Sequence, residues 1–171
     1  MENFTNETID TKQLPRFEEV ELSSLHPKYW NVIVLNNSIL FLIIAVVLAF
    51  FIYKVEELNH LSAYILIGFG IILLIAFYLS RIGFKKKGFA FRNHDVIYRS
   101  GIIATNTMVI PYNRVQHVAL HEGFISRYFG LAKVEIFTAG GSSSDIEIPG
   151  IAKEEAENIK QLLMGKIQKQ L

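Results

Sequence analysis

Residues 39–53, ILFLIIAVVLAFFIY, contain no charged or strongly polar side chain. With 32–38 before them they form a run of about 22 residues, which as an α-helix reaches about 33 Å, enough to cross a hydrocarbon core of about 30 Å. A helix in the core of a globular protein would keep a polar stripe at the helical period, and this run has none. It therefore predicts a membrane-spanning helix at about 32–53.

A second apolar run at 61–79 is just long enough to span with little tilt. The connecting residues 54–60 are too few for a folded domain, so the two runs are expected to form a hairpin with both ends of the chain on one side. Tyr29, Trp30 and Tyr78 lie where aromatic rings prefer the headgroup layer, which supports these limits.

Four basic residues follow the second run: Arg81, Lys85, Lys86 and Lys87. The connector at 54–57 carries a net negative charge instead. Because Lys and Arg accumulate on the cytoplasmic side, both termini are expected in the cytoplasm of a multi-pass cell-membrane protein. The same four residues are candidate lipid contacts, since each could gain about 1 kcal/mol near an anionic leaflet. The alternative is that they only set the topology.

The strand-rich part begins at about residue 88, where six short β-rich runs alternate with turn residues: 89–92, 96–99, 102–110, 114–121, 132–138 and 146–148. A helix is predicted after them, because Ala152, Ala156, Ile159, Leu163 and Ile167 share one helical face. The fold class is therefore a two-span α-helical hairpin plus an α+β domain, a bent antiparallel sandwich or barrel capped by the C-terminal helix.

The predicted organisation has three parts: a polar cytoplasmic tail at 1–28, the transmembrane hairpin at 29–80 and a cytoplasmic domain at 81–171. The 171 residues include no cysteine, which excludes disulfides, thiolate nucleophiles and Cys-based metal sites. The basic residues lie beside the spans and are not interleaved with aromatics, so no nucleic-acid partner is expected.

No residue is assigned to catalysis, a cofactor or a metal. The serines at 142–144 beside Asp145 lack a G-x-S-x-G elbow. His117 and His121, with Glu122 adjacent, lack the third and fourth ligands that a metal site needs, and partly exposed strand histidines are the preferred interpretation. The chain is accordingly not expected to be an enzyme.

Five segments in order carry a family resemblance: SGI at 100–102, IPYNRVQHV at 110–118, SRYFGLA at 126–132, FTAGG at 137–141 and IPGI at 148–151. Directly after a two-span hairpin, they resemble the bacterial pleckstrin-homology-like (PH-like) membrane proteins of the YdbS-like family. The motif residues are Gly101, Pro111, Tyr112, Arg114, Val115, Gln116, Arg127, Gly130, Thr138, Ala139, Gly140, Pro149 and Gly150. The resemblance covers the chain from about residue 25.

The resemblance implies a bent sheet of nominally seven strands in a bacterial membrane protein. It indicates a fold and a location more than a mechanism. The missing strand is expected inside 102–110 or around 122–129. Pro111 suits a strand boundary and Gly130 a tight turn. Arg114 or Arg127 either pairs with a buried carbonyl or carboxylate, or faces a ligand.

The expected function is that of a non-catalytic adaptor, which presents its PH-like domain to a protein partner for interaction or complex assembly in a bacterial envelope. The alternative is an anionic-lipid sensor acting through the basic juxtamembrane residues Arg81, Lys85, Lys86 and Lys87. Eukaryotic relatives of the fold often bind inositol lipids through basic residues of the first hairpin, here Arg92 and Arg99. Membrane lipids and a protein in the same membrane are the expected partners, and a homo-oligomer is a further candidate.

Overall fold

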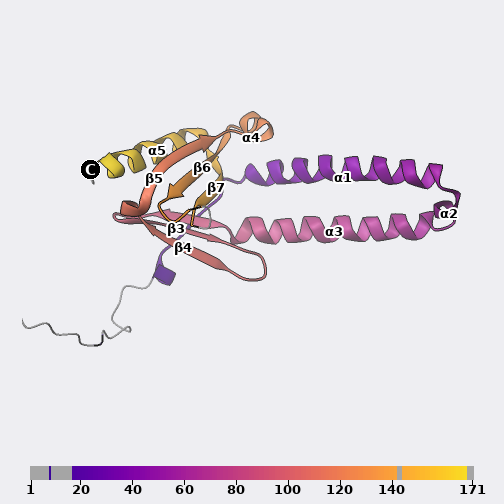
Figure 1. Ribbon diagram of the computed structural model, residues 1–171, viewed down its shortest axis with the longest axis horizontal. Coiled ribbons are helices and arrows are strands. Elements are labelled where there is room, and N and C mark those ends of the chain that lie inside the picture. The colour runs from indigo at the N-terminus through magenta and orange to yellow at the C-terminus, as the bar shows by residue number, and fades with distance from the viewer. Residues whose placement is uncertain (1–7, 9–16, 142–143, 169–171) are drawn as a thin grey trace, which may run out of the picture.

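The computed structural model describes residues 8, 17–141 and 144–168. A long helical hairpin projects from one end of a strand-rich domain (Figure 1). Most of the predicted tail and the serines at 142 and 143 lie outside the described residues.

The hairpin consists of α1 (Tyr29–Lys54) and α3 (Ser62–Lys86), joined through the short helix α2 (Glu56–Asn59), which replaces the predicted simple turn. Both long helices have the length and composition to cross a membrane, and almost none of their apolar side chains are buried within the protein. A helix that is apolar on all sides yet uncovered by protein is suited to lipid, not to a protein core.

Side-chain contacts between α1 and α3 hold the long helices together. Asn37 Nδ2 donates to Ser80 Oγ at 2.9 Å. Farther into the apolar region, the ring of Phe41 packs against Phe69 and Phe77, with centroids 5.8 and 6.3 Å away. Packing and interhelical hydrogen bonds are the forces that associate helices in lipid, where the hydrophobic effect between them is absent.

In the part of the chain that the structure describes, seven strands form two antiparallel sheets: β1 (Ser23–Ser24), β2 (Gly88–Phe91), β3 (Asp95–Ser100) and β4 (Asn106–Pro111) in one, and β5 (Val115–His121), β6 (Leu131–Thr138) and β7 (Ile146–Ala152) in the other. Strand order within each sheet follows the chain. The described strands do not close into a barrel, so of the two predicted arrangements the structure has the open, two-sheet one. The predicted fold class is confirmed.

The seventh strand is not where the sequence prediction placed it. It is β1, which precedes the first helix and pairs through Ser23 with Phe89 and through Ser24 with Gly88. Within 102–110 the strand begins only at Asn106, and the region 122–129 contains a helix, α4 (Phe124–Tyr128). A two-residue strand is too short to show a sequence period. It forms only because the tertiary structure places it beside β2, so the sequence alone could not predict it.

The C-terminal helix α5 (Lys153–Gln168) covers the domain with the face predicted for it. Its buried residues are Ala156, Ile159 and Leu163, which join the apolar residues of both sheets in one core. Ala152, predicted on the same face, is the last residue of β7. The described residues also contain two one-turn helices, η2 (Phe17–Glu19) and η3 (Tyr112–Arg114).

The start of the hairpin packs against the domain at Gly150 of β7. The carbonyl of Gly150 accepts a hydrogen bond of 2.9 Å from the backbone N–H of His26. Its backbone has φ +67°, and a Cβ built there would lie 2.3 Å from Cγ of Tyr29, the first residue of α1. Glycine is therefore required both by the backbone conformation and by the close approach of the helix.

Candidate functional site

The basic flank, defined as Lys85, Lys86, Lys87 and Arg99, lines one hollow of about 340 Å³ at the end of α3. Arg99 comes from β3, where it pairs with Gly88 directly after the lysines. Ser24 of β1 and Thr105 add two hydroxyl groups. Among the described residues that line this hollow none is acidic, so it could bind an anion such as a phosphate.

The three lysines are not equivalent. Lys85 and Lys86 are exposed and lie in the last turn of α3, where the helix dipole favours positive charge. Lys86 Nζ donates to the carbonyl of Ile102 at 2.6 Å. Lys87 is half-buried, and burial lowers its pKa from the ordinary value, with Glu147 acting in the opposite direction.

Arg81, the fourth predicted lipid contact, lies apart from this hollow. Its guanidinium carbon is 4.7 Å from the ring centroid of Trp30 and 5.6 Å from that of Phe84. A guanidinium stacked on an indole is a cation–π contact, and here it joins the start of α1 to the end of α3. The structure thus groups three of the four predicted residues with Arg99.

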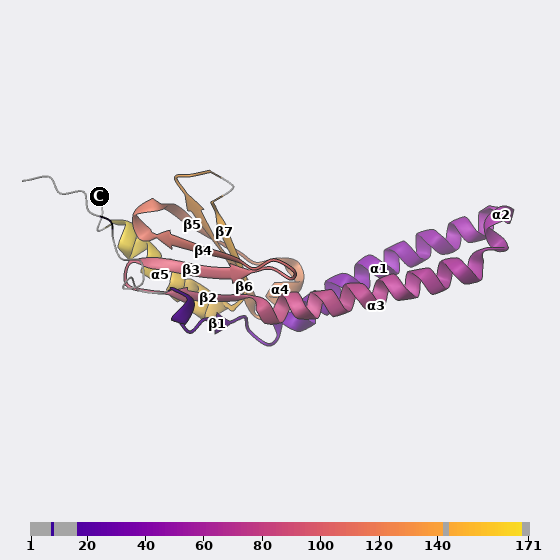
Figure 2. The ribbon, with the colours of Figure 1, turned by 90° about the horizontal axis from the view of Figure 1, so that it is seen from below.

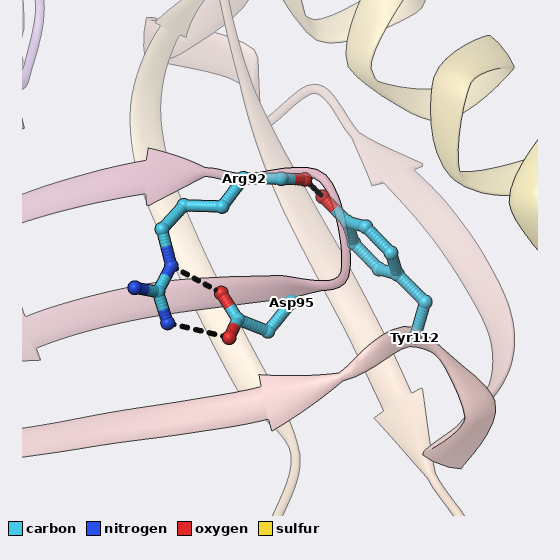
Figure 3. A network of polar contacts seen from close by, with 3 residues as sticks. All are labelled: Arg92, Asp95 and Tyr112. Atoms are coloured by element: carbon cyan, nitrogen blue, oxygen red, sulfur yellow. Dashed lines mark hydrogen bonds and ion pairs between the residues drawn. The ribbon is translucent and has the colours of Figure 1, made fainter. Parts of the chain in front are cut away.

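Arg92 is paired within the protein (Figure 3). Its Nε and Nη2 donate to the two carboxylate oxygens of Asp95 at 2.6 and 2.5 Å, and its carbonyl accepts from the Tyr112 hydroxyl at 2.6 Å. The hydrogen bond that Arg92 donates to the Asp95 side chain raises the pKa of Arg92 above its ordinary value. This bidentate pair closes the turn between β2 and β3.

Arg92 and Arg99 therefore do not form the shared headgroup pocket considered for the first hairpin. In the β2–β3 register, Phe91 pairs with Val96 beside the turn, whereas Gly88 pairs with Arg99 at the other end. Arg99 belongs with the lysines of the basic flank. Arg92 lies at the turn of this hairpin and Arg99 near the far end of β3, so the two arginines are at opposite ends of it.

Several family-motif residues shape turns or fill the core. Gly101, Gly130 and Gly150 have positive φ angles of 122°, 69° and 67°. Tyr112 and Val115 are buried in the core. The remaining motif residues lie at the end of β4 (Pro111), after it (Arg114), on β5 (Gln116), in α4 (Arg127), at the β6–β7 connection (Thr138, Ala139, Gly140) and in β7 (Pro149).

The β6–β7 connection is held by side-chain hydrogen bonds. The backbone N–H of Thr138 donates to Asp145 Oδ1 at 2.8 Å, and the hydroxyls of Thr138 and Ser144 lie 2.5 Å apart. The Thr138 hydroxyl also accepts from the N–H of Gly140 at 3.4 Å. Asp145 thus stabilises a turn, which is a structural role.

The side chains of Arg114 and Arg127 are exposed, and neither forms an ion pair or a side-chain hydrogen bond with the described part of the protein. Arg114 lines a hollow of about 490 Å³ with Val109, Pro111 and four further residues beside β4. Arg127 lines another, with Leu35 of α1 and three residues of α4. The predicted pairing with a buried carbonyl or carboxylate is therefore not seen for either arginine among the described residues, and a ligand-facing role stays a prediction.

His117 of β5 has an aromatic neighbour. The ring of His117 stacks on Phe137 with centroids 4.2 Å apart and an interplanar angle of 16°. Within residues 8, 17–141 and 144–168, no group of three or more His, Cys, Asp or Glu side chains could hold a metal ion.

Helix α4 was not predicted from the sequence. Its apolar residues Phe124, Ile125 and Tyr128, with Phe129 directly after the helix, recur at i, i+1, i+4 and i+5, and this helical period could have identified it. Phe124 and Tyr128 are also among the most exposed large side chains of the domain.

Two sheets, a capping C-terminal helix and a membrane hairpin define a membrane-associated protein with a PH-like domain. The chain belongs to the bacterial PH domain family, whose sequence model matches residues 32–167. The expected resemblance is confirmed.

Two relatives are transmembrane proteins of Bacillus subtilis (strain 168). The chain is 27% identical to UPF0699 transmembrane protein YdbT over 150 residues, which are 85% of this chain and 30% of YdbT. It is 28% identical to UPF0699 transmembrane protein YdbS over 88 residues, which are 52% of this chain and 54% of YdbS. The chain thus spans a third to about half of the length of these relatives. No solved structure shows a significant match.

Proposed function

We propose that the protein is a non-catalytic, membrane-anchored adaptor that offers the free edge of β4 to an extended segment of a partner protein. The main support for this proposal is the strand order of the first sheet, in which β4 is last and, among the described strands, pairs with β3 alone. A peptide can add a strand to such an edge through main-chain hydrogen bonds.

The composition of β4 supports this use. Exposed sheet edges are normally protected by charged side chains, proline or bulges. β4 reads Asn-Thr-Met-Val-Ile-Pro, has no charge, and contains proline only as its last residue, Pro111. Val109 is 39% exposed on this strand and lines the hollow beside Arg114. The hollow offers alternate side chains of an added strand an apolar contact and one cation.

The proposed location is the cytoplasmic face of a bacterial cell membrane. The support is the positive-inside pattern: the basic flank adjoins the strand-rich domain, whereas the hairpin tip carries Glu56 and Glu57. An adaptor held at this face would meet cytoplasmic proteins and the inner parts of membrane proteins. The predicted division into a tail at 1–28, a hairpin at 29–80 and a domain at 81–171 belongs to this proposal with two limits moved, because β1 (Ser23–Ser24) pairs with the domain and α3 continues to Lys86.

The test places a photo-crosslinking residue at Val109 of the full-length protein in its native membrane. The control position is Leu162, an exposed residue of α5. We expect a stoichiometric protein adduct from position 109, and its loss when Thr107→Lys adds an edge charge. An adduct that forms equally at both positions, or one that contains only a second copy of this chain, would refute the adaptor proposal.

A second candidate is an anionic-lipid sensor, favoured by the gathering of Lys85, Lys86, Lys87 and Arg99 around one hollow. The test is the ratio of phosphatidylglycerol to phosphatidylcholine retained by the purified full-length protein. We expect retention of the anionic lipid to fall with added salt and in a variant with all three lysines changed to glutamine. Lys160→Gln on α5 is the control. An unchanged ratio in the triple variant would contradict lipid sensing by this flank.

A further inference from the structure

Three large apolar side chains of the strand-rich domain are almost completely exposed. Ile103 in the turn between β3 and β4 is 96% exposed, and Phe124 and Tyr128 of α4 are 94% and 84% exposed. Covering an apolar side chain of this size is favourable, because it removes apolar surface from water. The positions of these three residues indicate what covers them.

Both elements lie against the hairpin, on opposite sides of it. In Figure 1, α4 lies above α1 and the β3–β4 turn extends below α3, and Figure 2 shows both at the same end of the domain. α4 and Leu35 of α1 line one hollow of about 460 Å³. On the other side, Ile102 packs on α3 so closely that a Cβ added to Gly83 would be 3.2 Å from its Cγ1.

The two contacts also occur at the same depth along the hairpin. Leu35 is four residues before the uninterrupted apolar run of α1, which begins at residue 39, and Gly83 is four residues after the second run ends at residue 79. At 1.5 Å per residue, each contact lies about 6 Å outside the apolar runs. The layer between hydrocarbon and water is about 5–7 Å thick in each leaflet, so both contacts fall within it.

Polar contacts between the helices mark the same level. Asn37 and Ser80, which share a hydrogen bond, lie within three residues of Leu35 and Gly83, and Arg81, which stacks over Trp30, lies two residues before Gly83. Aromatic and arginine side chains are enriched where hydrocarbon meets the headgroups. A water-soluble partner could not reach a surface at this depth without displacing lipid.

We propose that α4 and the β3–β4 turn are two interfacial anchors that insert Phe124, Tyr128 and Ile103 into the leaflet on opposite sides of the hairpin. The partner of this surface is the bilayer itself. Arg127, in the same helix as Phe124, would reach lipid phosphate oxygens, which guanidinium groups bind well. This inference depends on the hairpin crossing the membrane and is independent of the adaptor proposal.

The backbone of the turn supports a fixed presentation of Ile103. Gly101 has φ +122°, and a Cβ built there would lie 1.9 Å from the carbonyl oxygen of Ala104. Lys86 Nζ binds the carbonyl of Ile102 from the side of α3. The turn is therefore held by the spanning helix at one residue and exposes the next residue toward the lipid.

The absence of cysteine from the sequence makes single-cysteine labelling possible without a background. Full-length Ile103→Cys and Phe124→Cys proteins are labelled with an environment-sensitive fluorophore and reconstituted in phosphatidylcholine–phosphatidylglycerol vesicles. Quenching is measured with nitroxide lipids labelled near the headgroup and, separately, with aqueous iodide. Leu162→Cys on α5 is the aqueous control, and Ile43→Cys in the middle of α1 is the buried-lipid control. Because the substituted side chains at 103 and 124 are almost fully exposed, the substitutions remove little packing.

We expect strong quenching by the shallow nitroxide lipid at both 103 and 124, with iodide quenching several-fold weaker than at 162. If either position follows the pattern of 162, the two-sided anchor is wrong. If a position is protected from both quenchers, a second copy of the chain covers it instead of lipid, which overturns the proposal as well.

Discussion

Replacing Gly150 by alanine tests how the hairpin is fixed to the domain. The new Cβ would lie 2.3 Å from Cγ and 2.6 Å from Cβ of Tyr29, in a backbone with φ +67°. A left-handed conformation costs a non-glycine residue about 1–2 kcal/mol, and forcing a methyl group into a packed site costs about 1–3 kcal/mol. We therefore expect the free energy of unfolding of the domain to fall by about 2–5 kcal/mol.

The matched control is Gly130→Ala. Gly130 has nearly the same φ, +69°, but nothing lies within 4 Å of an added Cβ, so only the backbone cost of about 1–2 kcal/mol applies. Both variants are unfolded with denaturant in a mild detergent and followed by circular dichroism. Trp30, the single tryptophan, adjoins Tyr29, so its emission should change in Gly150→Ala alone. Equal losses of stability in the two variants would refute the claimed contact with the start of α1.

Three further predictions concern the core, the pH dependence and the helix pair. Burial raises the pKa of Tyr98 to about 12 from 10.0, so as the pH rises the unfolded chain loses this proton before the folded protein does. The free energy of unfolding, measured by denaturant titration, should therefore fall by up to about 1.4 kcal/mol per pH unit between pH 10 and pH 12. An equally steep fall in Tyr98→Phe would contradict this. Leu163→Ala, at a fully buried position of α5, should cost about 2–5 kcal/mol in denaturant titrations, whereas the exposed Leu162→Ala should cost about 0.5 kcal/mol or less. Asn37→Ala should weaken the helix pair by about 0.5–2 kcal/mol, measured as faster proteolysis in detergent, because Ser80 loses its hydrogen-bond partner; an unchanged rate would rule out this contribution.

The elements that the sequence predicted well have a strong period or a long uniform composition. The run at 39–53 has no polar interruption, and the apolar positions of α5 repeat at the helical spacing, so each element is determined by its own residues. The six predicted β-rich runs all contain strands, with changed limits. Each of these runs is too short to show more than a few repeats of the two-residue alternation, so pairing with the neighbouring strand decides where each strand ends.

The elements that the sequence did not predict depend on distant neighbours. β1 exists because Ser23 and Ser24 lie beside β2, more than sixty residues later in the chain. The turn at 102–104 replaces an expected strand because Gly101 reverses the chain and Ile102 packs on α3. The basic flank was visible as three lysines, but Arg99 joins them only through the β2–β3 register. Such relations require the tertiary structure.

The family motif itself has mainly a structural meaning in this chain. Gly101, Gly130 and Gly150 adopt backbone conformations that other residues resist, and Tyr112 anchors the β2–β3 turn from the core. A motif of this kind specifies the fold, and it is compatible with different partners in different members of the family. The surfaces proposed for interaction are the edge of β4, the basic flank and α4, and of the motif only Pro111 and Arg127 lie on β4 or α4. Variation in partner or lipid preference among relatives should therefore follow these three surfaces more than the motif glycines and Tyr112.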